Sequence, residues 1–302
     1  MRYRPFARTG MAVSVLSLEL SGEDDRKPAE WCELVHAAFE EGVNAFELVN
    51  PSPALLTGFA EGAEAVKRSL LFIGLRADAA AEGAPLESGV HQVIAQTRLG
   101  YLDLLTLGAG VTRSEDLLTA AIRLKDADVA RLLAVAGAAD EILDADVASG
   151  LFDAVLTPFS LLSGWRDRNM VRRALEAQMG VIGCDPCPEE LESLMETAQA
   201  KTKPGWFKPK PQPLAGVGTY AFLGSTRGWT AEQICLSYAL AEPALATVQM
   251  AVSDRKHLAV LAATTDRDLP SQVSAQIEMA RFSAEEAARQ SAARESAARH
   301  HA

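Results

Sequence analysis

The sequence predicts an α/β protein in which eight parallel strands alternate with helices and close into a (β/α)8 TIM barrel. Short apolar runs recur along the chain, and amphipathic stretches with helical spacing lie between them. Eight such units in 302 residues favour a closed barrel over an open doubly wound sheet. No Gly-x-Gly-x-x-Gly pattern follows the first run, which also counts against the open sheet.

The expected strands are short and bounded by polar or glycine residues. They cover residues 13–18, 45–49, 70–75, 102–107, 132–136, 154–157, 180–184 and 246–250. Helical patterns between them cover residues 29–41, 86–99, 114–124, 140–149 and 165–178. Because parallel strands of a barrel all point the same way, chemistry is expected where these strands end.

Composition excludes several classes of protein. Apolar residues make up 48% of the chain and charged residues 23%, which is typical of a globular protein. The net charge of −11 argues against general nucleic-acid binding, because that needs a cationic face. No run reaches the roughly 18 apolar residues of a membrane span. The four cysteines do not form the disulfide pattern of a secreted domain, so we expect a cytoplasmic protein.

Two segments interrupt the alternation of strands and helices. Residues 201–213 hold four lysines and four prolines, so we expect a loop or extended arm there. This arm carries the candidate partner-binding residues Lys203, Trp206, Phe207, Lys208 and Lys210. The alternative interpretation of this segment is a solvated loop without a partner.

Ser283 and Glu286 form a capping-box pattern that begins an Ala-rich tail. We therefore expect a barrel over residues 1–282 and a helical tail over 283–302.

Four stretches of the chain resemble the aldo-keto reductase family, in the family's order. Residues 2–22 (RYRPFARTGMAVSVLSLELSG) resemble its N-terminal hairpin and first strand, and residues 41–52 (EGVNAFELVNPS) its second strand and loop. Residues 98–107 (RLGYLDLLTL) are similar to its fourth strand, and residues 229–254 to its last helix and strand. The resemblance implies an N-terminal hairpin, a barrel with extra C-terminal helices, and an ancestry among NAD(P)H-dependent carbonyl reductases.

The resemblance also implies four vestigial catalytic positions. The family's aspartate, tyrosine, lysine and histidine correspond to Glu47, Ser52, Arg76 and Gly108. A serine hydroxyl is a far weaker acid than a phenol with a pKa of about 10. Arg76 keeps a positive charge but cannot exchange a proton near neutral pH. We expect Glu47 and Arg76 to pair as ions, and we expect ordinary reductase activity to be lost.

The cofactor positions implied by the resemblance are altered as well. The tyrosine that stacks on the nicotinamide corresponds to Cys184, and the following serine to Asp185, whose carboxylate would repel a pyrophosphate. The loop that faces the adenosine phosphate corresponds to residues 251–254, and Ser253, Asp254 and Arg255 are the residues there that could meet an anion at a helix N-terminus. We expect at most weak NAD(H) binding, no tight NADP(H) binding and no metal site.

Three functions stay open at this point. The first is a catalytically inactive regulator that acts through protein partners and could sense NAD(H). Degenerate members of the family include a bacterial cell-cycle and cell-division regulator, so the resemblance implies FtsZ and a histidine kinase as candidate partners. The second is an oxidoreductase with altered chemistry that uses Glu47 and Arg76. The third is a redox switch through Cys184 and Cys187, although Pro186 between them matches a proline of the family.

Overall fold

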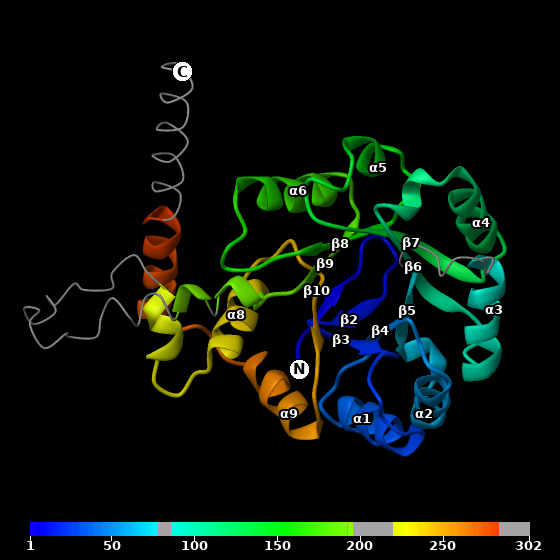
Figure 1. Ribbon diagram of the computed structural model, residues 1–302, viewed down its shortest axis with the longest axis horizontal. Coiled ribbons are helices and arrows are strands. Elements are labelled where there is room, and N and C mark those ends of the chain that lie inside the picture. The colour runs from blue at the N-terminus through cyan, green and yellow to red at the C-terminus, as the bar shows by residue number, and fades with distance from the viewer. Residues whose placement is uncertain (78–85, 192, 196–219, 284–302) are drawn as a thin grey trace, which may run out of the picture. The chain divides into compact units, whose positions relative to one another are not determined.

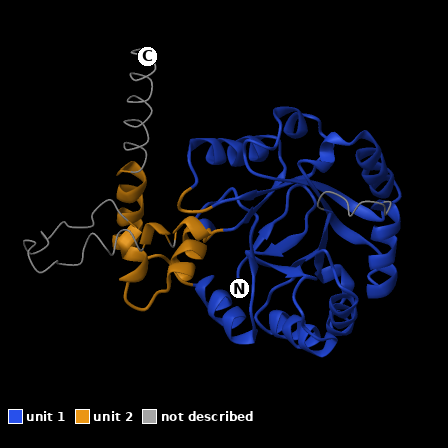
Figure 2. Cartoon of the chain, viewed as in Figure 1, with its two compact units in different colours: residues 1–159, 163–185, 239–266 blue, residues 160–162, 186–238, 267–302 orange. Residues whose placement is uncertain are grey.

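The computed structural model describes residues 1–77, 86–191, 193–195 and 220–283 (Figure 1). The chain divides into two compact units (Figure 2). The barrel unit comprises residues 1–159, 163–185 and 239–266, and the second unit comprises residues 160–162, 186–238 and 267–302. The expected boundary between a barrel over residues 1–282 and a tail over 283–302 stays a prediction, because residues beyond 283 lie outside the described part.

The predicted eight-stranded parallel barrel is confirmed. Its strands close in the order β10, β3, β4, β5, β6, β7, β8, β9, and every neighbouring pair is parallel. The bounds are β3 Leu16–Ser21, β4 Ala45–Val49, β5 Phe72–Ala77, β6 Leu102–Gly108, β7 Ala130–Ala136, β8 Ala154–Pro158, β9 Gly180–Cys184 and β10 Thr247–Ala251. Each strand places alternate residues inside the barrel and against the surrounding helices.

The first predicted strand, residues 13–18, is wrong in its bounds. It joins two elements, because β2 (Ala12–Ser14) pairs antiparallel with β1 (Tyr3–Pro5), whereas β3 begins at Leu16. The chain bends between them at Val15. The Ser14 hydroxyl donates to the carbonyl of Leu16 at 2.7 Å, and the Ser14 amide donates to Asn44 Oδ1 at 2.8 Å. These polar bonds interrupt an apolar run that otherwise looks continuous.

Helices cover the outside of the barrel strands (Figure 1). In the barrel unit these are α1 Pro28–Glu40, α2 Pro53–Ala63, α3 Leu86–Thr97, α4 Glu115–Asp126, α5 Asp144–Ala148, α6 Trp165–Glu176 and α9 Arg255–Thr264. Most of α8 (Ala231–Leu240) belongs to the second unit. Residues 271–283 are also helical, and single 3₁₀ turns cover Arg68–Leu70, Val111–Arg113 and Tyr220–Gly224. The predicted helix over 140–149 begins later, at Asp144, because Asp146 caps the amide of Leu143 at 2.9 Å.

The hairpin closes the N-terminal end of the barrel. Phe6, which follows β1, is fully buried, and its ring centroid lies 4.5 Å from that of Phe72 at the start of β5. A Cβ added at Gly180, the first residue of β9, would lie 2.8 Å from the Phe6 ring. Glycine at this position therefore lets the aromatic ring fill the barrel floor.

The second unit has a small apolar core of its own. Leu161, Leu191, Phe222, Ile234 and Ile277 belong to it, and Cys187 packs against it. Arg267 stacks on the Trp229 ring at 3.9 Å. Among the described residues, no helix is both long enough and apolar enough to cross a membrane.

Candidate functional site

A buried charge network occupies the C-terminal half of strands β3, β4, β5, β6 and β10. The expected ion pair between Glu47 and Arg76 is present, and Glu47 is only 4% exposed. In the pairing of β4 with β5, Arg76 lies opposite Val49, which is two residues beyond Glu47. The same NH2 group of Arg76 also lies 3.0 Å from Glu19 Oε2 and donates to Gln249 Oε1 at 2.7 Å.

Both oxygens of the Glu47 carboxylate accept hydrogen bonds. Thr106 Oγ1 donates to Oε1 at 2.5 Å, and Gln249 Nε2 donates to Oε2 at 2.7 Å beside the Arg76 contact. Gln249 therefore donates to the carboxylate and accepts from the guanidinium. Charge-assisted bonds of this kind are stronger than neutral ones. The carboxylate is held from three strands, which suits a structural ion network better than a group that must move a proton.

Arg76 is held in its charged form. Burial by itself lowers the pKa of the guanidinium, but the carboxylates of Glu47 and Glu19 outweigh burial and raise the pKa above its ordinary value. A guanidinium with a raised pKa cannot give up a proton at neutral pH. Arg76 therefore supplies a fixed positive charge at the barrel mouth and no acid–base chemistry.

Thr106, Gln249 and Glu19 were not identified from the sequence as members of this network. The sequence feature that could have identified them is the alternation of inward and outward residues along a strand. Each of them is a polar residue at an inward position of an otherwise apolar run. Gln249 lies opposite Ser17 in the pairing of β10 with β3, the contact that closes the barrel. The residues of this network can therefore be identified only when the pairing of β10 with β3 is known in addition to the polar and apolar pattern of each strand.

The other two positions that the resemblance implies, Ser52 and Gly108, carry neither a phenol nor an imidazole. Ser52 is the N-cap of α2, and its hydroxyl accepts a hydrogen bond from the Leu55 amide at 3.2 Å. Gly108 ends β6 opposite Ala136. None of the four tyrosines follows a barrel strand: Tyr3 lies in β1, Tyr101 precedes β6, and Tyr220 and Tyr238 belong to the second unit.

The cofactor positions on β9 are unlike a nicotinamide platform. Cys184 ends the strand, and burial raises the pKa of its thiol to about 12, although the Arg76 charge acts in the opposite sense. A thiol with that pKa stays protonated and is a poor nucleophile. Asp185 follows with a positive φ of 47°. A buried thiol and a carboxylate therefore end this strand, where the sequence resemblance implies an aromatic ring and a hydroxyl.

The groove at the start of α9 has a cavity of about 640 Å³, and carboxylates outnumber arginines among its lining residues, four to two. The Asp254 carboxylate caps α9 by accepting from the His257 amide at 2.8 Å, and this bond lowers the pKa of Asp254. Arg255 pairs with Glu40 at 2.6 Å. Ser253 contacts the His257 ring through its amide and hydroxyl, both 3.2 Å from Nδ1.

The remaining cation of this groove, Arg26, is also engaged. It donates to the carbonyls of Val252 at 3.0 Å and Ser253 at 2.7 Å, and its guanidinium lies 4.7 Å from the centre of the Trp31 ring. A nucleotide phosphate would meet the Asp254 carboxylate at the helix terminus that should bind it. The residues described at this groove therefore do not fit an NAD(H) or NADP(H) phosphate.

Cys187 contacts a different cysteine from the one expected from the sequence. The Cys187 thiol is hydrogen-bonded to Cys235, and the two belong to the second unit. This bond and burial raise the pKa of Cys235 far above its usual range. Cys184 belongs to the barrel unit. Among the described residues, no group of three or more His, Cys, Asp or Glu side chains could hold a metal ion.

The candidate partner-binding residues, Lys203, Trp206, Phe207, Lys208 and Lys210, lie outside the described residues, as does the tail beyond 283. Their role stays a prediction.

Comparison with known proteins gives a structural match. The aldo-keto reductase AKR11C1 from Bacillus halodurans, in its holo form, is similar with a TM-score of 0.69 and 14% identity, over 92% of this chain and 95% of that chain. Its apo form matches with a TM-score of 0.65 and 15% identity over the same shares. No protein-family model and no curated protein matches the sequence. The likeness shows that this chain has the barrel fold of these aldo-keto reductases.

Proposed function

We propose that the protein is an aldo-keto-reductase-like barrel that does not reduce carbonyls and that acts as a regulator through protein partners. The observation that carries the proposal is the closed network around Glu47. Its two oxygens accept from Thr106, Gln249 and Arg76, so both oxygens of the Glu47 carboxylate are already engaged.

Carbonyl reduction needs a proton donor within about 2.6–3.2 Å of the developing alkoxide. Ser52 caps a helix, Gly108 has no side chain, and Arg76 holds its proton. The groove at α9 is a poor place for a nucleotide phosphate because Asp254 caps the helix. Donor and cofactor contacts are therefore lost together, which supports a change of function over a change of one catalytic residue.

The nature of the partners rests on resemblance. The sequence is similar to the alphaproteobacterial cell-cycle regulator KidO in its altered reductase positions, its acidic Ala-rich composition and its extended small-residue C-terminus. This similarity makes the division protein FtsZ and a histidine kinase the first partners to test. The basic, aromatic arm over residues 201–213 suits an acidic protein surface, because aromatic side chains often dominate interfaces.

Purified protein is expected to give no turnover with a panel of aldehydes and ketones in the presence of NADH or NADPH. The measurement is the loss of absorbance of the reduced cofactor, with an active aldo-keto reductase as the positive control. Calorimetry with NAD(H) and NADP(H) is expected to show weak binding or none. Clear turnover that Glu47→Gln abolishes would overturn the proposal and support the alternative, an oxidoreductase that uses Glu47 and Arg76.

The proposed binding to a protein partner is tested in a separate experiment. Purified FtsZ is expected to bind the full chain in a biosensor assay, and a Trp206→Ala, Phe207→Ala variant is expected to bind it more weakly by about tenfold or more, as loss of aromatic anchors commonly does. Phe282→Ala is a matched control, because this exposed aromatic residue lies outside the arm. Equal binding by the arm variant would remove the arm from the interface, and absence of binding would exclude FtsZ.

A further inference from the structure

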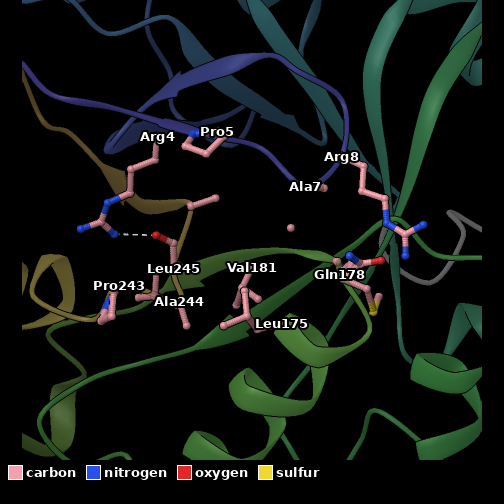
Figure 3. Close-up of a pocket in the computed structure, with 13 residues that line it drawn as sticks. Arg4, Pro5, Ala7, Arg8, Leu175, Gln178, Val181, Pro243, Ala244 and Leu245 are labelled. Atoms are coloured by element: carbon pink, nitrogen blue, oxygen red, sulfur yellow. Dashed lines mark hydrogen bonds between the residues drawn. The ribbon is translucent and has the colours of Figure 1, made fainter.

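A groove at the N-terminal end of the barrel unit has a cavity of about 560 Å³ (Figure 3). Its walls come from the hairpin, the segment between α6 and β9, and the segment that precedes β10. This end of the barrel is opposite the strand ends that carry Glu47 and Arg76, and Figure 3 shows Arg4 and Arg8 on opposite sides of the opening. The volume is sufficient for a small metabolite.

The charge of the groove opposes that of the chain. The chain carries a net charge of −11, yet the residues that line the cavity include two arginines and no acidic residue. Arg2, Arg4 and Arg8 of the hairpin form no ion pair with a carboxylate of the described residues. The Glu242 carboxylate acts on Arg4 from outside the cavity lining, so Arg8 is the arginine that gives the groove its local positive potential.

The two arginines differ in what they already bind. Arg4 donates to the carbonyls of Leu240 at 2.6 Å, Glu242 at 3.1 Å and Leu245 at 2.5 Å, so it anchors the hairpin. Burial, and then the neighbouring Arg2 charge, lower the pKa of Arg4. Arg8 is exposed and makes no such contact within the described residues. Its guanidinium is therefore the group that can bind an anion.

The groove also has apolar walls beside Arg8. Val181 and Met179 are buried behind it, whereas Leu175 is 52% exposed at its edge. Gln178 lies next to Arg8 in Figure 3 and offers an amide donor. A smaller cavity of about 380 Å³ shares Arg8 and Gln178, and its one carboxylate, Asp153, is neutralised by Lys125 at 2.6 Å. No unpaired acid thus opposes an anion here.

We propose that this groove binds a small amphipathic carboxylate. The carboxylate accepts hydrogen bonds from the Arg8 guanidinium and the Gln178 amide, a geometry that suits the planar fork of arginine. The apolar chain lies along Leu175 toward Pro243 and Ala244, which line the same cavity and are not buried. The proposal is independent of the proposed function, because it concerns the opposite end of the barrel.

Octanoate is the probe, titrated into the full chain by calorimetry and followed by the methyl NMR shifts of Leu175 and Ala244, which line the cavity and are not buried. Acetate lacks the apolar chain and 1-octanol lacks the charge, so both are expected to bind at least about tenfold more weakly. Arg8→Ala is expected to weaken octanoate binding by about tenfold or more, the effect of losing a charged hydrogen-bond donor. Leu175→Ser is expected to weaken it independently.

Arg123→Ala is the matched control, since that arginine is 67% exposed on α4 and does not line the groove. It is expected to bind octanoate as the unchanged protein does. Circular dichroism and the thermal midpoint check that each variant is folded. The proposal is overturned if octanoate causes no shift in the methyl groups of Leu175 and Ala244, if Arg8→Ala binds it equally well, or if 1-octanol binds as tightly as octanoate.

Discussion

Replacing Arg76 by alanine is expected to destabilise the protein by about 3–5 kcal/mol, the usual cost of removing one partner of a buried ion pair. Glu47 is 4% exposed and would be left in the barrel without the guanidinium that pairs with it, and Glu19 would lose its cation as well. The Gln249 amide and the Thr106 hydroxyl would remain as neutral donors. The free energy of unfolding in urea, measured for both proteins, gives the difference.

Two further variants separate charge from shape. Arg76→Lys keeps the positive charge and should lose less stability than Arg76→Ala. The double variant Glu47→Gln, Arg76→Met removes both charges and should be far closer to the unchanged protein, because a neutral or apolar replacement of a buried ion pair is often nearly neutral. If Arg76→Ala costs less than about 1 kcal/mol, the value of an exposed pair, the network does not stabilise the barrel.

The barrel itself could be predicted because its signal is local. Runs such as residues 45–49 and 180–184 are apolar, short and bounded by turns, and the structure gives β4 and β9 the same bounds. The Glu47–Arg76 ion pair could also be predicted from the sequence, because β4 and β5 are consecutive strands and therefore adjacent in the barrel. The prediction of a single strand over residues 13–18 was wrong, because Ser14 ends one strand and Leu16 begins another.

The rest of the site depends on contacts between distant parts of the chain. Gln249 reaches Glu47 only because β10 closes onto β3, and no periodicity within either strand shows that closure. Cys187 is a second example. Its position in a Cys-x-Pro-Cys pattern suggests Cys184 as its partner, whereas its hydrogen-bond partner in the structure is Cys235 on α8. Such pairings arise from tertiary packing, which a local pattern does not encode.

Gly58→Ala is expected to destabilise the protein by about 3 kcal/mol, the upper part of the usual range for overpacking. A Cβ at Gly58 on α2 would lie 2.2 Å from the carbonyl oxygen of Pro28 and 2.5 Å from Cβ of Trp31, both on α1. Neither is the far end of a flexible side chain, so the two helices must separate. Trp31 is 1% exposed and would lose part of its packing. Urea unfolding measures the loss.

Gly89→Ala on α3 is the matched control, because a Cβ there meets nothing within 4 Å. Alanine favours a helix over glycine by up to about 1 kcal/mol, so this change should be neutral or stabilising. Both changes replace a helical glycine by alanine, and the intrinsic preference largely cancels between them. The difference between the two variants, about 4 kcal/mol at most, therefore isolates the close approach of α2 to α1. Equal stability of the two variants would show that α1 and α2 can separate without loss.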